Sequence, residues 1–461
     1  MSNAGAHISL YPFPTSGHII PLLDLADRLL THGLNVTVFI TPKNRALLDP
    51  LLSAHSSSPS LHPLLLPSPE ISPSFSPAKR LVSMLRTLRD LHYPLLLDWF
   101  QSHPSPPVAI VSDFFLGWTQ ELAAKLGVRR IVFSPSGALA ASVYQALWHD
   151  QPSIDEHSQI SFPGIPNSPK YYWYQISHTY RDLTRGDPDW EFSKENTKFN
   201  LLSWGYVFNS FSEIERVYLD HLKQKMGHDR VWAVGPLLPS DVNIAPTNRG
   251  GTSSVAVDTV LTWLDERGDN TVIYICFGSR TVLTSKQVEV LAAALEKSQV
   301  HFIWCVALQP ADGDGAMPEG FEQRLAGKGL LIKGWAPQVA ILRHRAVGSF
   351  LTHCGWNSTL EGISAGVVML TWPMGADQFT NANLLADELE VAIRVGESTQ
   401  IIAESNELAR VLTESLDRNR TEKIRVEKLR NTAVRAVNGG SSENELSQFV
   451  KKINELRVAK G

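Results

Sequence analysis

The sequence predicts an α/β protein built from two doubly wound parallel sheets, and three observations carry this prediction. Short apolar runs that favour strands alternate with helical patterns in both halves of the chain, as over 7–40 and 272–306. A stretch rich in Pro, Gly, Ser and Asn, 236–254, separates the halves and is typical of a linker. The chain has 461 residues, 43% hydrophobic and 19% charged, which is enough for more than one globular domain.

These observations predict the domain boundaries. We expect a first Rossmann-like domain over residues 1–240, a linker over 241–255 and a second Rossmann-like domain over 256–441. The terminal segment 442–461 begins with apolar residues at helical spacing, so we expect a helix that packs back on the first domain.

Charge and cysteine content exclude several classes of function. A formal net charge of −4 gives no field that would attract nucleic acid or an anionic membrane. Cys276, Cys305 and Cys354 are an odd number without paired spacing, which favours free thiols in a reducing compartment. The first residues lack a secretory pattern, and no run approaches the length of a membrane span. We therefore expect a cytoplasmic protein without membrane insertion. We also expect a monomer, although the oligomeric state does not follow from these features.

The first domain opens with a strand-helix-strand pattern. Strands are predicted over 7–11 and 35–40, with a helix over 19–30 between them. The loop after the first strand has no G-x-G-x-x-G fingerprint, so a bound dinucleotide cofactor is not expected. Residues 53–79 are dense in Ser and Pro and are predicted to form an irregular loop.

Two polar residues stand where the ligands of a parallel sheet are expected. Asp113 follows directly after the predicted strand 108–111, and His18 follows a strand and loop at the head of a helix. A neutral imidazole with one nitrogen held by a carboxylate can take a proton from a hydroxyl group. Because the chain has 15 histidines, the alternative that His18 is an ordinary loop residue stays open on this pattern alone.

The segment 144–204 contains many aromatic residues with little periodicity. Aromatic side chains on irregular backbone suit a pocket for a flat apolar ligand. The alternative, that part of them pack helices together, remains open.

The stretch 335–378 has the features of a nucleotide-sugar site. An apolar strand end over 349–352 leads into the turn HCGWNS and a helix that opens at Thr359, whose free N–H groups can receive a diphosphate. Trp335 offers a face for a base, and the Asp377-Gln378 pair suits sugar hydroxyls. The triplet 312–314, Asp-Gly-Asp, is interpreted as a loop and not as a metal site.

This stretch, from WAPQ through HCGWNS to the final DQ, resembles the signature of the plant secondary-product glycosyltransferases of family 1. PFPTSGHIIP, SDFF and CFGS extend the resemblance over essentially the whole chain. It implies the GT-B fold, with two Rossmann-like domains facing across a cleft, and transfer of a sugar from a UDP-sugar. His18 and Asp113 match the family's catalytic dyad, which acts as general base in an inverting displacement.

The resemblance also implies the ligand contacts. No cofactor or metal is implied, because the UDP-sugar is a co-substrate. The donor contacts are Trp335 and Ala336 for uracil; Gln338 and Glu361 for ribose; Ser279, His353, Asn357 and Ser358 for the phosphates, with Gly355 allowing close approach; and Trp356, Asp377, Gln378 and Ser136 for the sugar. The residues expected to line the acceptor site are Phe13, Phe114, Phe115, Trp118, Tyr144 and Trp148.

The function expected from the resemblance is transfer of glucose from UDP-glucose to a phenolic hydroxyl of a small molecule, with a flavonoid as the acceptor. Gln378 at the end of the signature favours glucose over galactose. UDP-xylose or UDP-rhamnose as donor and a hydroxybenzoate as acceptor are alternatives. An alternative of another class is a sensor that binds the sugar nucleotide without turnover, although such a sensor needs neither His18 nor Asp113.

Overall fold

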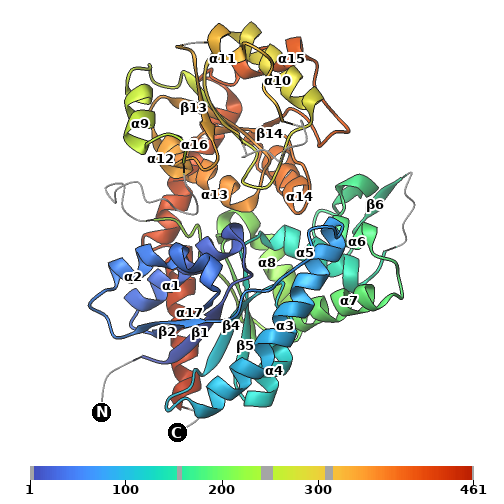
Figure 1. The fold of residues 1–461 in the computed structure, drawn as a ribbon, viewed down its shortest axis with the longest axis vertical. Helices are drawn as coiled ribbons and strands as arrows, with labels where there is room; N and C mark the ends of the chain where they lie inside the picture. Colours follow the sequence, from blue (N-terminus) through green and yellow to red (C-terminus); the bar gives the residue numbers. More distant parts are fainter. Residues whose placement is uncertain (1–4, 153–157, 240–252, 307–314, 326, 459–461) are drawn as a thin grey trace. The chain divides into compact units, whose positions relative to one another are not determined.

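A computed structural model shows two compact units (Figure 1). The first contains Met1–Pro239 and Arg435–Gly461, and the second contains Ser240–Val434. The second boundary therefore falls inside the long helix α16 (Thr421–Val437) and not at residue 442. None of the helices in the described part of the chain has the length and apolar character of a membrane span. The structure describes residues 5–152, 158–239, 253–306, 315–325 and 327–458.

The first unit is built on a parallel sheet with the strand order β3-β2-β1-β4-β5-β8-β9. The order reverses between β1 and β4, which pair directly, and such a switch point opens a ligand crevice at the carboxyl ends of the strands. The strands are β1 (His7–Tyr11), β2 (Asn35–Ile40), β3 (Leu61–Leu65), β4 (Ala109–Asp113), β5 (Arg129–Ser134), β8 (Gly205–Phe208) and β9 (Val231–Ala233).

The strand β3 corrects the prediction of an irregular loop over 53–79. It lies at the edge of the sheet and pairs with β2, with Pro63 opposite Val38. Proline lacks the N–H that a central strand needs, so an edge strand is where a sheet tolerates it. The Ser and Pro content therefore predicted a loop where a strand forms, because the strand depends on pairing with β2 and not on its own composition.

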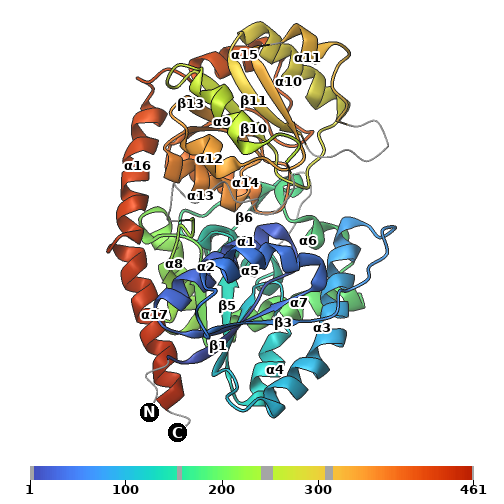
Figure 2. The same cartoon turned by 60° about the vertical axis from the view of Figure 1, so that its left-hand side comes forward.

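Helices cover the sheet of the first unit, and the C-terminal helix α17 (Ser441–Val458) is one of them (Figure 2). Leu446, Phe449 and Ile453 belong to the same buried core as Ile8, and the ring of Phe449 lies 5.1 Å from that of Trp232. The remaining elements are α1 (Ser16–Thr31), η1 (Pro42–Leu48), α2 (Asp49–Ala54), α3 (Pro77–Ser102), α4 (Thr119–Leu126), α5 (Ala138–His149), β6 (Gln159–Ser161), β7 (Lys170–Tyr172), η2 (Trp173–Gln175), α6 (His178–Asp182), α7 (Pro188–Leu201) and α8 (Ser212–Met226).

The second unit repeats this architecture with a parallel sheet in the order β12-β11-β10-β13-β14-β15. Thr284 and Gln287 form a capping box at the start of α10 (Ser285–Ser298): the Thr284 hydroxyl accepts from the N–H of Gln287, and the Gln287 side-chain oxygen accepts from the N–H of Thr284. The strands are β10 (Val272–Cys276), β11 (His301–Val306), β12 (Gly329–Lys333), β13 (Val347–Thr352), β14 (Val368–Thr371) and β15 (Ala392–Arg394). The helices are α9 (Val257–Asp265), α10 (Ser285–Ser298), α11 (Phe321–Arg324), α12 (Gln338–Arg343), α13 (Trp356–Ala365), α14 (Gln378–Asn383), η3 (Leu384–Glu388), α15 (Ser405–Glu414) and α16.

The helix after β13 begins earlier than predicted. Gly355 is the N-cap and α13 starts at Trp356, whereas the sequence predicted a start at Thr359. Asn357 and Ser358 therefore lie in the first turn, where backbone N–H groups have no partner within the helix. The triplet 312–314 lies outside the described residues.

Candidate active site

In the first unit, His18 and Asp113 form a hydrogen-bonded pair. Nδ1 of His18 lies 2.7 Å from Oδ2 of Asp113, whose side chain is fully buried, while the His18 side chain is 19% exposed. The other carboxylate oxygen accepts a hydrogen bond of 2.9 Å from the N–H of Phe115. Because an ionised carboxylate only accepts, Nδ1 carries the proton and Nε2 of His18 is left as an acceptor.

The sheet topology explains why two residues 95 positions apart meet. Strands β1 and β4 are neighbours in register, with Tyr11 opposite Ser112. His18 is the third residue of α1, which follows β1, and Asp113 is the last residue of β4. Both side chains therefore lie at the carboxyl edge of the sheet, at the switch point of the strand order.

Aromatic rings surround the imidazole of His18. Phe114 and Phe115 stack on it, with centroid distances of 5.8 Å and 5.3 Å and interplanar angles of 26° and 23°. Phe13 meets it edge-on at 5.4 Å, and the ring of Tyr144 lies 5.9 Å from that of Phe114. Four of the six residues predicted for the acceptor site are thus brought together around the dyad.

Trp118 and Trp148 are placed differently. Each is 1% exposed and packs inside the first unit, Trp118 against Tyr11 and Trp148 against Tyr180 and Trp190. The prediction that they contact the acceptor is corrected, because their rings leave no surface for a ligand. The Trp148 ring lies 6.4 Å from that of Tyr144, and the alternative of helix packing holds for this member of 144–204.

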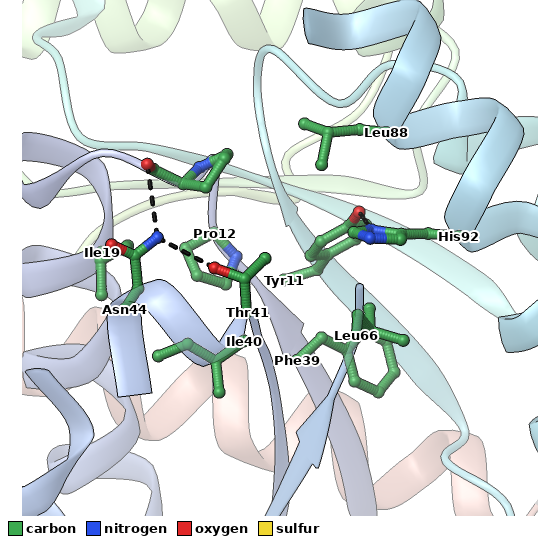
Figure 3. Close-up of a pocket in the computed structure, with 11 residues that line it drawn as sticks. Tyr11, Pro12, Ile19, Phe39, Ile40, Thr41, Asn44, Leu66, Leu88 and His92 are labelled. Atoms are coloured by element: carbon green, nitrogen blue, oxygen red, sulfur yellow. Dashed lines mark hydrogen bonds between the residues drawn. The ribbon is translucent and has the colours of Figure 1, made fainter. Parts of the chain in front are cut away.

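A small cavity lies beside the start of α1 (Figure 3). Its volume is about 10 Å³, room for roughly one water molecule and far less than an aromatic acceptor needs. The Tyr11 hydroxyl donates to Nδ1 of His92 at 2.5 Å, because Nε2 of His92 donates to the carbonyl of Pro67. Burial raises the pKa of Tyr11 and lowers that of His92, so both stay neutral and the cavity is a feature of packing. Its lining consists of Tyr11, Pro12, Pro14, Ile19, Phe39, Ile40, Thr41, Asn44, Leu66, Leu88 and His92.

In the second unit, Gln338 links the segment after Trp335 to α13. Its amide nitrogen donates to Oγ of Ser358 at 2.9 Å and to Oε2 of Glu361 at 2.7 Å. The hydroxyl of Tyr274, on β10, donates to the amide oxygen of Gln338 at 3.2 Å. Gln338, Ser358 and Glu361, three residues predicted to bind the UDP-sugar, are therefore held together by hydrogen bonds. Tyr274 was missed, because an aromatic residue inside an apolar strand gives no sign of a polar role.

His353 follows the last residue of β13 and lies between two glycines. A Cβ added at Gly278 or at Gly355 would stand 2.6 Å from Nε2 of His353, and Gly278 also has a φ of +79°. Nδ1 is buried and has no hydrogen-bond partner among the described residues. Burial lowers the pKa of His353 to about 4, partly offset by the backbone of Cys276, so the ring is neutral near pH 7. An orphaned ring nitrogen beside the first turn of α13 suits a ligand contact.

Gln378 and its neighbours shape the turn before α14. Its side-chain oxygen accepts from the N–H groups of Met374 and Gly375, at 2.8 Å and 3.0 Å, so only its amide N–H₂ remains for a sugar. Asp377 is the N-cap of α14. Asn381, one turn further, donates to the carbonyl of Cys354 at 2.9 Å and fixes the turn before α13. No sequence signal marked Asn381.

The remaining residues predicted to contact the UDP-sugar are distributed over both units. The ring of Trp356 is 3% exposed, so a contact with a ligand would come from its backbone and not its ring. Ser136 follows β5 in the first unit, where its carbonyl accepts from Ser134. The others are an exposed Ser279, half-buried Trp335 and Asn357, and a buried Ala336.

Comparison with known proteins identifies the family. The model of the family described as UDP-glucoronosyl and UDP-glucosyl transferase matches residues 235–419. The flavonol 3-O-glucosyltransferase UGT89B1 of Arabidopsis thaliana is 49% identical over 98% of this chain and 97% of its own. The crystal structures of Arabidopsis thaliana UGT89C1 complexed with UDP-L-rhamnose and with quercetin are 38% and 37% identical, cover 98% of this chain and 100% of theirs, and give TM-scores of 0.81 and 0.78. The chain belongs to the plant UDP-glycosyltransferases and is a glycosyltransferase of the GT-B fold.

Proposed function

We propose that the enzyme transfers glucose from UDP-glucose to a phenolic hydroxyl of a flavonoid, with His18 as general base. Nε2 of His18 takes the proton of the hydroxyl as its oxygen attacks the anomeric carbon. The bond from that carbon to the diphosphate breaks, and UDP leaves with the electron pair from the opposite face. The configuration inverts, and the products are a β-glucoside, UDP and a proton on His18.

The observation that carries this proposal is the 2.7 Å contact between His18 and the buried Asp113. The carboxylate fixes the tautomer in which Nε2 accepts, and it stabilises the imidazolium formed in the reaction. The stacked rings of Phe114 and Phe115 present an apolar face beside that nitrogen, which suits a flat aromatic acceptor.

The binding of the UDP-sugar would rest on groups of the second unit. The first turn of α13 offers free N–H groups to the diphosphate, and His353 and Ser358 lie beside it. Gln338 and Glu361, already hydrogen-bonded to each other, would hold the ribose hydroxyls. We propose that no metal ion is needed, since helix N–H groups supply the stabilisation of the departing diphosphate.

A second donor, UDP-rhamnose, is favoured by one specific finding. The UGT89C1 structure, 38% identical over nearly the whole chain, is complexed with UDP-L-rhamnose. Rhamnose lacks the 6-hydroxyl, so a site that binds this hydroxyl through Asp377 or Gln378 would discriminate between the two sugars. UDP-xylose and a hydroxybenzoate acceptor remain further candidates within the same chemistry.

The test is a mass-spectrometric screen of the purified protein with UDP-glucose, UDP-rhamnose, UDP-xylose and UDP-galactose against flavonols, flavones and hydroxybenzoates. We expect a mass gain of one hexose on a flavonoid with UDP-glucose, unchanged by a metal chelator. A gain of one deoxyhexose alone would assign the rhamnose donor. Absence of product from all pairs, with UDP still bound, would favour the non-catalytic sensor and contradict the proposal.

A further inference from the structure

A buried arginine stands next to the dyad, and among the described residues it has no charged hydrogen-bond partner. Arg130, on β5, is 1% exposed. Its Nε donates to the hydroxyls of Ser112 and Thr119 at 3.0 Å and 2.9 Å. Its two Nη atoms donate to the carbonyl of Phe199 at 3.0 Å and to the amide oxygen of Asn200 at 2.9 Å. All four acceptors are neutral, so these contacts leave the positive charge uncompensated.

The buried anion of this region is Asp113. It follows Ser112 on β4, the strand next to β5, and its side chain has no exposure to solvent. Burial lowers the pKa of Arg130 to about 9, and the Tyr206 phenol, once it is ionised, and the Asp113 carboxylate act in the opposite direction. At neutral pH the guanidinium therefore remains protonated. A cation and an anion buried on adjacent strands stabilise each other with little screening by water.

The same guanidinium supports the loop that carries the stacked rings. Asn200, which accepts from Arg130, donates through its amide nitrogen to the carbonyl of Phe114 at 2.9 Å. One turn earlier on α7, Asn196 donates to the carbonyl of Phe115 at 2.8 Å. Arg130 thus ties α7 to the end of β4 on both sides of Asp113.

From this arrangement we propose that Arg130 is a positioning residue of the catalytic dyad: it is the buried counter-charge of Asp113 and holds the loop that stacks on His18. This inference rests on the proposed role of His18 as base. Adding a proton to the dyad raises its charge by one, whichever residue carries the proton. A nearby cation disfavours that state, so Arg130 keeps the dyad free of a proton down to lower pH.

The other titratable groups packed here do not supply this effect. Among the described residues they include the phenols of Tyr206 on β8, Tyr144 on α5 and Tyr11 on β1. Burial raises the pKa of all three, so they are neutral near pH 7. The side chains that α7 brings to the loop, Asn196 and Asn200, are neutral amides. Arg130 is therefore the group whose charge the dyad senses.

The test compares Arg130→Met, which removes the charge, with Arg130→Lys, which keeps it. We follow the acid limb of the pH profile of kcat/KM, and the titration of the His18 ring resonance by NMR, assigned by its loss in His18→Gln. In Arg130→Met both midpoints should move to higher pH by about one unit or more. In Arg130→Lys the midpoints should stay nearer the wild-type value. Arg129→Met is the matched control, because Arg129 is exposed on the same strand and its charge is screened.

A second pair of variants decides the question if Arg130→Met does not fold. Asn200→Asp and Asn200→Ala both remove the bond to the Phe114 carbonyl, but only the first places a carboxylate against the guanidinium. The aspartate variant should titrate at higher pH than the alanine variant. The inference would be overturned if the titration midpoint were the same in Arg130→Met and Arg130→Lys, and the same in Asn200→Asp and Asn200→Ala, with only the thermal stability lowered. Because the NMR titration does not depend on turnover, failure of the proposed function would instead show as full activity of His18→Gln.

Discussion

The two units each place a histidine at the carboxyl edge of a parallel sheet, and the two histidines differ in their partners. His18 faces a buried carboxylate 2.7 Å away, whereas His353 lies between glycines and its Nδ1 has no hydrogen-bond partner among the described residues. A carboxylate stabilises the protonated ring that forms when a base acts. Desolvation without a carboxylate lowers the pKa of His353 to about 4 and keeps that ring neutral. The same side chain is thus suited to proton removal in one unit and to ligand contact in the other.

The largest expected effect is that of His18→Gln. Glutamine keeps a polar side chain but cannot take a proton, so kcat/KM should fall by about 10²–10⁴-fold. The dissociation constant of UDP, measured by calorimetry, should not change, because its proposed contacts lie in the second unit. The control is His62→Gln, an exposed residue of β3 in the same sheet. Full activity of the first variant would show that another group removes the proton.

Asp113→Asn should have the next largest effect. The amide cannot stabilise an imidazolium and can present its N–H₂ to Nδ1, which favours the wrong tautomer. A loss of about 10²-fold or more in kcat is expected, with KM for the acceptor little changed. The measurement is steady-state kinetics with one flavonoid acceptor. A change confined to acceptor KM would mean that Asp113 shapes the binding site and not the base.

His353→Asn tests the other side of the comparison. Loss of one contact to the diphosphate should weaken UDP binding by roughly tenfold, with the rate at saturating donor less affected. His301→Asn is the matched control, since His301 begins β11 at the opposite edge of the same sheet. Wild-type UDP affinity in His353→Asn would remove this residue from the donor site.

The stability of the protein in acid should also depend on His353. Its pKa falls from 6.5 to about 4 on folding, so the folded state binds fewer protons between these values than the unfolded state. The contribution of the neutral ring is complete above pH 6.5 and is lost as the pH falls to about 4, by at most roughly 3 kcal/mol. Denaturant unfolding across this range should therefore show a smaller loss of stability in His353→Asn. If the free energy of unfolding fell with pH equally steeply in His353→Asn and in the wild type, the desolvated state of the ring would be contradicted.

A smaller effect on donor kinetics than that of His353→Asn is expected for Gln338→Ala. Removing the link to Ser358 and Glu361 should raise KM for the donor several-fold, equivalent to about 1 kcal/mol, and leave kcat nearly unchanged. Tyr274→Phe, which removes only the hydrogen bond to Gln338, should have a smaller effect in the same direction. A larger loss in kcat than in donor affinity would place Gln338 closer to the chemistry than proposed.

The elements with strong periodicity were predictable from the sequence, and those that depend on distant pairing were not. The strand-helix-strand pattern around His18 depends on residues that are near one another in the chain, and it was predicted. The edge strand β3 depends on pairing with β2, and its composition pointed to a loop. Within the site, the motif residues were predicted from the resemblance to the glycosyltransferase family. The supporting residues Tyr274, Asn381 and Arg130 were not, because a buried polar contact leaves no pattern in the sequence.

The most direct test of the base assignment uses an acceptor that needs no base. At about pH 8, para-nitrophenol is largely ionised while phenol is not, so only phenol requires proton removal by His18. The measurement is the ratio of wild-type to His18→Gln kcat/KM for each acceptor. The proposed mechanism predicts a loss of about 10²-fold or more for phenol and of less than about tenfold for para-nitrophenol. Equal losses for the two acceptors would contradict the role of His18 as the group that removes the proton.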